Sequence, residues 1–374
     1  MAWVGEGQAS RTGSPYWSNR PISRRIGRCK VVRSARPLPT RLSRPHGRRP
    51  AHDGREWRSE GSRVRCGGPP AGSPSLGNLL AWAPQPIPVL PVVGVVLAVW
   101  YCWAVHRMRA RGRTWPWSRT ASFLAGCLLL VSVTGLGVEG YGYRLFSVWM
   151  FQHLTLSMAI PPMLVLGAPG TLLLRTTPHH GLGRPILTAA VVGLRSRSAR
   201  ILLSPGVTIP LFLFSYYGIY LSPVFDTVAE TWIGHTGLEV FFLVTGVLFI
   251  LPVLSLDPLP VKQSSLGKFF DLFLEMPLHV FFGVILMMAT TPLLSTFATL
   301  PAAWGIDPMQ DQQWAGALAW SYGEPVALVV VVVFAIRWNR DENRVARIRE
   351  KQAERDGNRE LDAYNAYLQS LPKR

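Results

Sequence analysis

The residues most able to do chemistry in this sequence stand within long apolar stretches. His153 lies in the stretch WMFQHLTLSM, and Met150 precedes it by three residues, which places both on one face of a helix. An ionisable side chain in such a stretch is a candidate functional group, because burying it among apolar side chains is costly. Imidazole and thioether ligands together suit copper, and imidazole also suits haem iron. The alternative is a hydrogen bond from His153 to a neighbouring helix.

A second pair of potential ligands is His235 and Glu239. Their i, i+4 spacing sets both side chains on one side of a helix, where they can reach the same metal ion. Asp226, in the preceding connection, is a further member of this group. The same spacing also occurs at an ordinary hydrogen-bonded helix start, so both interpretations stay open.

A third set follows one helix face at i+4 steps, from Asp271 through Glu275 to His279. Such a stripe can relay protons or hold a cation, and it can equally form a polar seam against another helix. Glu324, just before Pro325, is a possible partner for His279, since a lone buried carboxylate must be protonated or paired.

Motifs of known enzymes are missing from the sequence. It contains no nucleotide-binding loop, no Ser-His-Asp arrangement and no HExxH helix, and its four cysteines form no CxxC pair. We therefore predict a protein that is not an enzyme.

The elements that position these residues are apolar runs long enough to cross a bilayer. About 20 residues at 1.5 Å each span the hydrocarbon core. This pattern predicts an all-α integral membrane protein, a bundle of seven transmembrane helices. The expected spans are 86–105, 119–138, 146–172, 200–221, 232–253, 270–294 and 314–337.

Basic residues alternate between the connections of these spans. Five arginines separate the first span from the second, five separate the third from the fourth, and Lys262 and Lys268 separate the fifth from the sixth. A further basic segment follows the seventh span, whereas the other three connections carry only Arg144. Cytoplasmic loops concentrate Lys and Arg, so we predict an N-terminus outside and a C-terminus in the cytoplasm.

The formal net charge of +18 is unevenly distributed. Residues 1–78 hold 16 Lys and Arg against 4 Asp and Glu, and they lack apolar periodicity. This distribution does not favour nucleic-acid binding. We interpret 1–78 as a disordered or mis-assigned leader, with a native start expected near 64–80, followed by a transmembrane domain at 79–340 and a charged helical cytoplasmic tail at 341–374.

Several segments together resemble one known family. They include FSVWMFQHLTLSMAIPPMLVLGAPGTLLLR (146–175), HTGLEVFFLVTGVLFILPVLSLDP (235–258), MPLHVFFGVILM (276–287), DQQWAGALAWSYGEP (311–325) and the basic segment 337–368. From about Trp82 to Leu368 the chain is similar to the assembly factors of caa-type cytochrome c oxidases, the CtaG-like family, in its actinobacterial form.

The resemblance implies a plasma-membrane protein that matures a haem-copper oxidase through copper delivery, with oxidase subunits and the lipid bilayer as its partners. Family members commonly show H-M-x-Q-H in the third span, where this chain has Trp149 in place of the first histidine. Further histidines of the fifth span are also missing, since Glu239 and Phe241 stand at their positions.

Our leading hypothesis is an oxidase assembly factor that handles copper in the outer half of the bundle through His153, Met150 and His235. One alternative is a copper or proton transporter that uses His279 and Glu324. Another is a haem-binding electron carrier. The candidate metal ligands are His153, Met150, His235, Glu239, His279 and Glu324.

Overall fold

The computed structural model describes residues 72–85, 87–178, 183–254, 256–257, 263–355 and 359–371, which all belong to one compact unit, Arg63–Arg374. These residues form helices and no strand; a single isolated bridge joins Trp82 to Leu136. The predictions made for residues 1–71 lie outside the described part.

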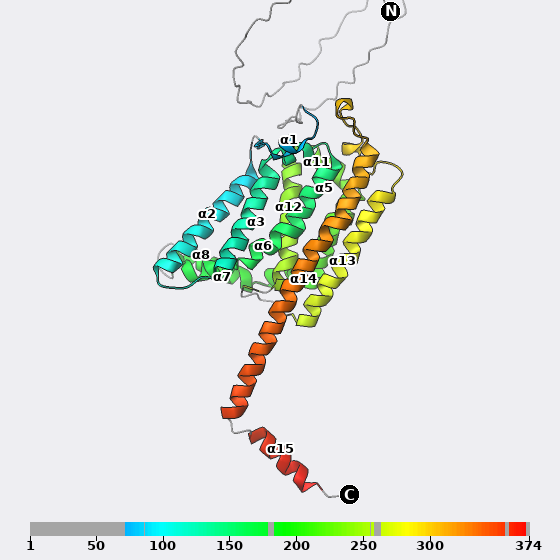
Figure 1. Ribbon diagram of the computed structural model, residues 1–374. Helices are drawn as coiled ribbons and strands as arrows, with labels where there is room; N and C mark the ends of the chain where they lie inside the picture. The colour runs from blue at the N-terminus through cyan, green and yellow to red at the C-terminus, as the bar shows by residue number, and fades with distance from the viewer. Residues whose placement is uncertain are drawn as a thin grey trace, which may run out of the picture. The chain divides into compact units, whose positions relative to one another are not determined.

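Six helical segments of the described chain are long and apolar enough to cross a membrane, so the all-helical, multi-pass prediction is confirmed. Figure 1 shows them packed side by side as a bundle. The segments are α2 (Val89–Ala110), α3 (Trp117–Gly135), the continuous run Phe146–Thr176, α12 (Trp232–Leu254), α13 (Ser265–Met288) and α14 (Pro308–Arg355).

The segment expected to span at 200–221 is shorter than predicted. It consists of α10 (Pro205–Leu213), nine residues long, the five-residue π-helix η2 (Phe214–Gly218) and two further helical residues, 219–220. At 1.5 Å per residue these reach about 24 Å, short of the roughly 30 Å of a hydrocarbon core. Six candidate spans therefore stand where seven were expected, and the seventh crossing and the orientation of the termini stay predictions.

The third span is interrupted in its middle. It comprises α5 (Phe146–Leu154), the π-helix η1 (Thr155–Ala159), α6 (Ile160–Leu166) and α7 (Pro169–Thr176). Pro161 and Pro162 supply no N–H group, so the carbonyls one turn earlier lose their helical donors and the register loosens there. The freed carbonyl of Ser157 faces Gly246 of α12, where a Cβ atom would lie 2.1 Å from the oxygen.

Helices α13 and α14 also pack closely against each other. A Cβ atom on Gly283 would lie 2.7 Å from the carbonyl oxygen of Gly316, and one on Gly316 would lie 2.7 Å from that of Gly283. Small residues at a crossing let two backbones approach within van der Waals contact, the usual way that helices associate in lipid.

Three aspartates bind the start of a helix elsewhere in the chain. Asp311 accepts hydrogen bonds from the amides of Phe146 and Ser147, and Asp257 accepts them from those of Gly170 and Thr171. Asp226 does the same for η3 (Ser295–Phe297). Each carboxylate satisfies free N–H groups at a helix N-terminus, so these aspartates connect the helices to one another.

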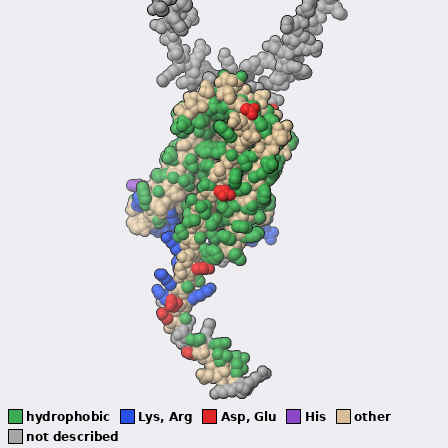
Figure 2. Space-filling view, turned by 45° about the vertical axis from the view of Figure 1, so that its right-hand side comes forward, with side chains coloured by type: hydrophobic (Ala, Val, Ile, Leu, Met, Phe, Trp, Pro, Cys, Tyr) green, Lys and Arg blue, Asp and Glu red, His purple; other side chains and the backbone are tan. Residues whose placement is uncertain are grey.

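Helix α14 continues past its apolar part as one helix to Arg355, and its residues from Asp341 onward are exposed. Figure 2 shows hydrophobic side chains over the visible face of the bundle, with Lys and Arg gathered near one end and along α14. The remaining helices are α1 (Leu76–Leu80), α4 (Gly137–Gly142), α8 (Gly183–Arg195), α9 (Arg197–Leu202), α11 (Val224–Ala229), η4 (Ala302–Trp304) and α15 (Arg359–Ser370).

Candidate metal centre

Three buried side chains, Glu139, His235 and Glu239, meet where α12 begins. One potential ligand atom from each lies within 4.8 Å of the other two. Nε2 of His235 is 3.3 Å from Oε1 of Glu139, and the three residues are only 1–3% exposed. Two carboxylates and an imidazole at this separation form a set of donors that a metal ion can occupy.

Local structure explains the convergence. His235 lies in the first turn of α12, and Glu239 follows one turn later on the same side of that helix. Glu139 comes from the short helix α4, which follows directly after α3 and carries the carboxylate into the bundle. The pairing of His235 with Glu239 predicted from their spacing is thus present, with a third member from another element.

Gln152 of α5 fixes the orientation of the Glu139 carboxylate. Its Nε2 atom donates to Oε2 of Glu139 at 2.7 Å and to the carbonyl oxygen of Val133 at 3.2 Å. Gly142 lies directly against the Gln152 amide, because a Cβ atom there would be 1.9 Å from Oε1. Gln152 therefore binds Oε2 of Glu139 and leaves Oε1 of Glu139 facing His235.

Aromatic rings hold His235 from two sides. The Tyr143 ring stacks on the imidazole with centroids 3.7 Å apart and planes 10° apart, and the Trp149 ring lies 4.3 Å away. The imidazole is thus packed in a fixed plane, an arrangement that orients ligand histidines for metal binding.

The three side chains of the centre affect one another's ionisation. Burial alone raises the pKa of the Glu139 carboxyl, but His235, and after it Glu239 and Gln152, stabilise the ionised form, so its pKa lies below the ordinary 4.5. Neither Nε2 of His235 nor Oε1 of Glu239 has a well-aligned hydrogen-bond partner among the described residues. Nε2 of His235 still faces Oε1 of Glu139 at 3.3 Å, and Glu239 lies beside the same carboxylate, so a bound metal ion would replace these contacts.

A sequence model of a protein family shows to which family the chain belongs. The model of the cytochrome c oxidase caa3 assembly factor family matches residues 99–341, a stretch that contains all three members of the centre. The chain belongs to this family. The resemblance seen in the sequence is therefore confirmed.

Mycobacterial relatives of this chain are known by sequence. An uncharacterized protein of Mycobacterium tuberculosis is 38% identical over 289 residues, which cover 76% of this chain and 44% of that protein. One of Mycobacterium leprae is 36% identical over 291 residues, with the same coverage. The chain thus spans less than half the length of the curated relatives it matches. No solved structure matches it.

His153 stands apart from the centre. Its Nδ1 atom lies 2.9 Å from the hydroxyl of Tyr220, and its ring stacks on Phe242 at 3.8 Å and on Tyr216 at 4.5 Å. The hydrogen bond to another helical segment, one of the two interpretations of His153, is therefore present. Met150, like His153, is fully buried. A metal-binding role for these two residues stays a prediction.

The stripe on α13 forms a second polar group in the bundle. Nδ1 of His279 lies 3.3 Å from Oε1 of Glu275, and Asp271 accepts a hydrogen bond of 2.5 Å from Gln263. Glu324, considered as a partner of His279, has an exposed side chain and acts on His279 electrostatically, whereas Glu275 makes the close contact. The reason is local, since Glu275 precedes His279 by one helical turn.

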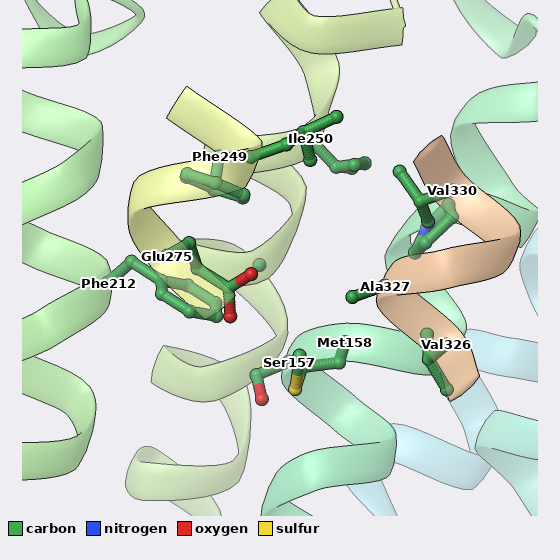
Figure 3. Close-up of a pocket in the computed structure, with 12 residues that line it drawn as sticks. Ser157, Met158, Phe212, Phe249, Ile250, Glu275, Val326, Ala327 and Val330 are labelled. Atoms are coloured by element: carbon green, nitrogen blue, oxygen red, sulfur yellow. The ribbon is translucent and has the colours of Figure 1, made fainter. Parts of the chain in front are cut away.

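A small cavity lies beside Glu275. Its volume is about 30 Å³, and Ser157, Met158 and Val326 are among its lining residues. Figure 3 shows the carboxylate of Glu275 directed into the space between η1, α12 and α14. The hydroxyl of Ser157 also lies 3.2 Å from that of Tyr216.

Two details of the centre differ from what the residues predicted. Asp226 does not join His235, because its two oxygens bind the amides of Ser295 and Thr296. Glu139 was missed, although one signal marked it: it is the only Asp or Glu between Glu60 and Asp226. A single acid retained in so long a stretch of apolar and basic residues indicates a specific buried partner.

Proposed function

We propose that this chain assists maturation of the copper centres of a haem-copper oxidase and holds copper as cargo at the Glu139–His235–Glu239 centre. Oxidase subunits are its protein partners, and the plasma membrane is its location. The chain acts by binding and handing over the ion, without catalysing a reaction. Two findings support this proposal: the chain belongs to a family of oxidase assembly factors, and the region that matches this family contains a buried set of potential ligands.

The observation that carries the proposal is the convergence of three buried potential ligands, Glu139, His235 and Glu239. A simple structural ion pair needs only two of them. A cargo site needs such ligands, held in place by neighbours that are not ligands themselves, here Gln152 and Tyr143.

The test is the copper content and optical spectrum of the terminal oxidase in a strain that lacks the gene. We expect the intact chain to restore both, and His235→Ala to restore neither under copper limitation while the variant accumulates normally in the membrane. Full oxidase activity with His235→Ala at limiting copper would overturn the proposal. An exposed substitution, Glu230→Gln, is the matched control.

A second candidate function, proton movement through the bundle, is favoured by the cavity beside Glu275. A volume of about 30 Å³ has room for one or two waters, and the Glu275 carboxylate and Ser157 hydroxyl supply polar partners. Sealed vesicles that contain the purified chain would show proton uptake under a potential, and Glu275→Gln would abolish it. Vesicles with no uptake above the lipid control would rule this function out.

The haem-carrier alternative has no comparable support. Tyr143 covers one face of the His235 ring, while Phe242 and Tyr216 stack on His153. Haem ligation by these two histidines would require those ring contacts to break, and we do not propose it.

A further inference from the structure

The charge of the Glu139–His235–Glu239 centre restricts the ion that it can hold. Potential ligand atoms of Glu139 and Glu239 lie within 4.8 Å of each other and of His235. When both carboxylates and a neutral imidazole bind an ion, the ligands together carry a charge of −2, and without the ion two carboxylates so close would repel each other strongly where water is excluded. A divalent cation neutralises this charge, whereas a monovalent cation leaves a buried charge of −1.

The ligand types give the same answer independently. The ligand atoms brought together are oxygens of Glu139 and Glu239 and a ring nitrogen of His235. Carboxylate and imidazole suit divalent first-row ions, among which Cu²⁺ binds most tightly in the general order, while Cu(I) is selected by thiolate and thioether ligands. A thioether such as that of Met150 would suit Cu(I), but Met150 is not one of the three residues of this ligand set.

The geometry around the three residues is also prearranged. Gln152 binds Oε2 of Glu139 at 2.7 Å, so Oε1 is the atom presented to His235. Tyr143 and Trp149 fix the plane of the imidazole. With its ligands held in this way, the centre needs little rearrangement to bind an ion.

We propose that the Glu139–His235–Glu239 centre binds a divalent transition-metal ion and takes copper as Cu(II) in preference to Cu(I). The inference rests on the proposed function only in treating copper as the cargo. The charge and the ligand types of the centre apply to the isolated chain whatever its partner is.

The experiment uses the full chain, purified in detergent and free of metal. Cu(II) is added as its sulfate, and electron paramagnetic resonance records the bound ion. We expect one Cu(II) per chain, with hyperfine coupling from a single imidazole nitrogen that is lost in His235→Gln. Competition with chelators should show binding of Cu(I), under reductant, at least about tenfold weaker than that of Cu(II).

Glu239→Gln is the discriminating variant, because it removes one charge and changes the side-chain shape little. We expect it to weaken Cu(II) binding at least about tenfold and to narrow the preference for Cu(II) over Cu(I). The control, Glu230→Gln, makes the same chemical change at an exposed position outside the centre. Circular dichroism and size-exclusion profiles confirm that each variant is folded.

Tighter binding of Cu(I) than of Cu(II), or unchanged Cu(II) binding in folded Glu239→Gln, would overturn the inference. Failure of the proposed function gives a different result. In that case the isolated chain still binds Cu(II) through His235 and Glu239, while His235→Ala supports a normal oxidase at limiting copper.

Discussion

Trp149 and His235 are in direct contact, with ring centroids 4.3 Å apart, at the edge of the Glu139–His235–Glu239 centre. The family motif H-M-x-Q-H has a histidine at the position of Trp149. The indole therefore occupies space beside the centre where a further imidazole ligand would fit. In the proposed metal centre, the aromatic side chain of Trp149 therefore takes the place of one histidine of the family motif.

Trp149→His is accordingly expected to add a ligand. We expect Cu(II) binding by the purified chain to become at least about tenfold tighter, with coupling from a second imidazole nitrogen in the paramagnetic resonance spectrum. Trp149→Phe is the control, since it keeps an aromatic ring without a ligand atom. Equal affinities for the two variants would show that position 149 does not face the metal site.

Gly246 allows the backbone of η1 to approach α12, and this contact predicts a second result. In Gly246→Ala the new Cβ would lie 2.1 Å from the carbonyl oxygen of Ser157, so one of the two segments must shift. We expect a loss of about 1–3 kcal/mol in the free energy of unfolding, measured by thermal or denaturant unfolding in detergent.

Gly237 is the matched control for Gly246, because it lies on the same helix and a Cβ there has no atom within 4 Å. Gly237→Ala should stabilise the chain, by up to about 1 kcal/mol, through helix propensity. Equal effects of the two substitutions would contradict the close approach of η1 to α12.

Much of the architecture could be predicted from the sequence, because apolar runs of about 20 residues separated by basic connections have few other solutions. The pair His235 and Glu239 was predicted for the same local reason, their i, i+4 spacing. Glu139 could not be assigned to them, because its partner lies almost a hundred residues away and only packing joins α4 to α12.

The errors have local causes as well. The span expected at 200–221 is interrupted at Leu203 and Ser204, before α10 begins, and hydropathy does not detect such an interruption. Asp226 was considered for the His235 group from its place in the chain, yet the free amides of η3 bind both of its oxygens. Helix termini compete for nearby carboxylates, and a sequence does not reveal which terminus is closest.

Asp226 predicts a dependence of stability on pH. Partial burial raises the pKa of its carboxyl, but hydrogen bonds from Thr296 and Ser295 outweigh this effect and hold the pKa below the ordinary 3.8. A lowered pKa means that the stabilisation is fully present above pH 3.8 and is lost as the pH falls through the lowered value. Asp226→Asn should therefore destabilise the chain at neutral pH and have a shrinking effect below pH 3.8.

The measurement for Asp226 is amide hydrogen exchange at Ser295 and Thr296, compared between the two proteins across the acid range. Faster exchange in Asp226→Asn at neutral pH, with the two proteins converging in acid, is the expected pattern. A difference that stays constant down to the lowest pH would show that the charge of Asp226 does not bind η3.

Substitution of His153 should lower the stability of the chain and leave copper binding unchanged, which is the reverse of the effect expected for His235. Its imidazole is bound to the Tyr220 hydroxyl and packed against Phe242, so His153→Ala leaves a buried hydroxyl without its partner and an empty volume beside the ring. We expect a loss of about 1–3 kcal/mol or more in the free energy of unfolding and a lower amount of protein in the membrane.

Tyr220→Phe, which removes the same hydrogen bond and keeps both rings, should reproduce part of this loss, and His153→Asn should recover part of it by keeping a polar partner for Tyr220. Copper bound per folded chain should stay unchanged in all three variants, whereas His235→Ala should lose copper at a normal protein level. If His153→Ala accumulated normally and lost copper, His153 would be a ligand, as the sequence first indicated, and the hydrogen bond to Tyr220 would be secondary to that role.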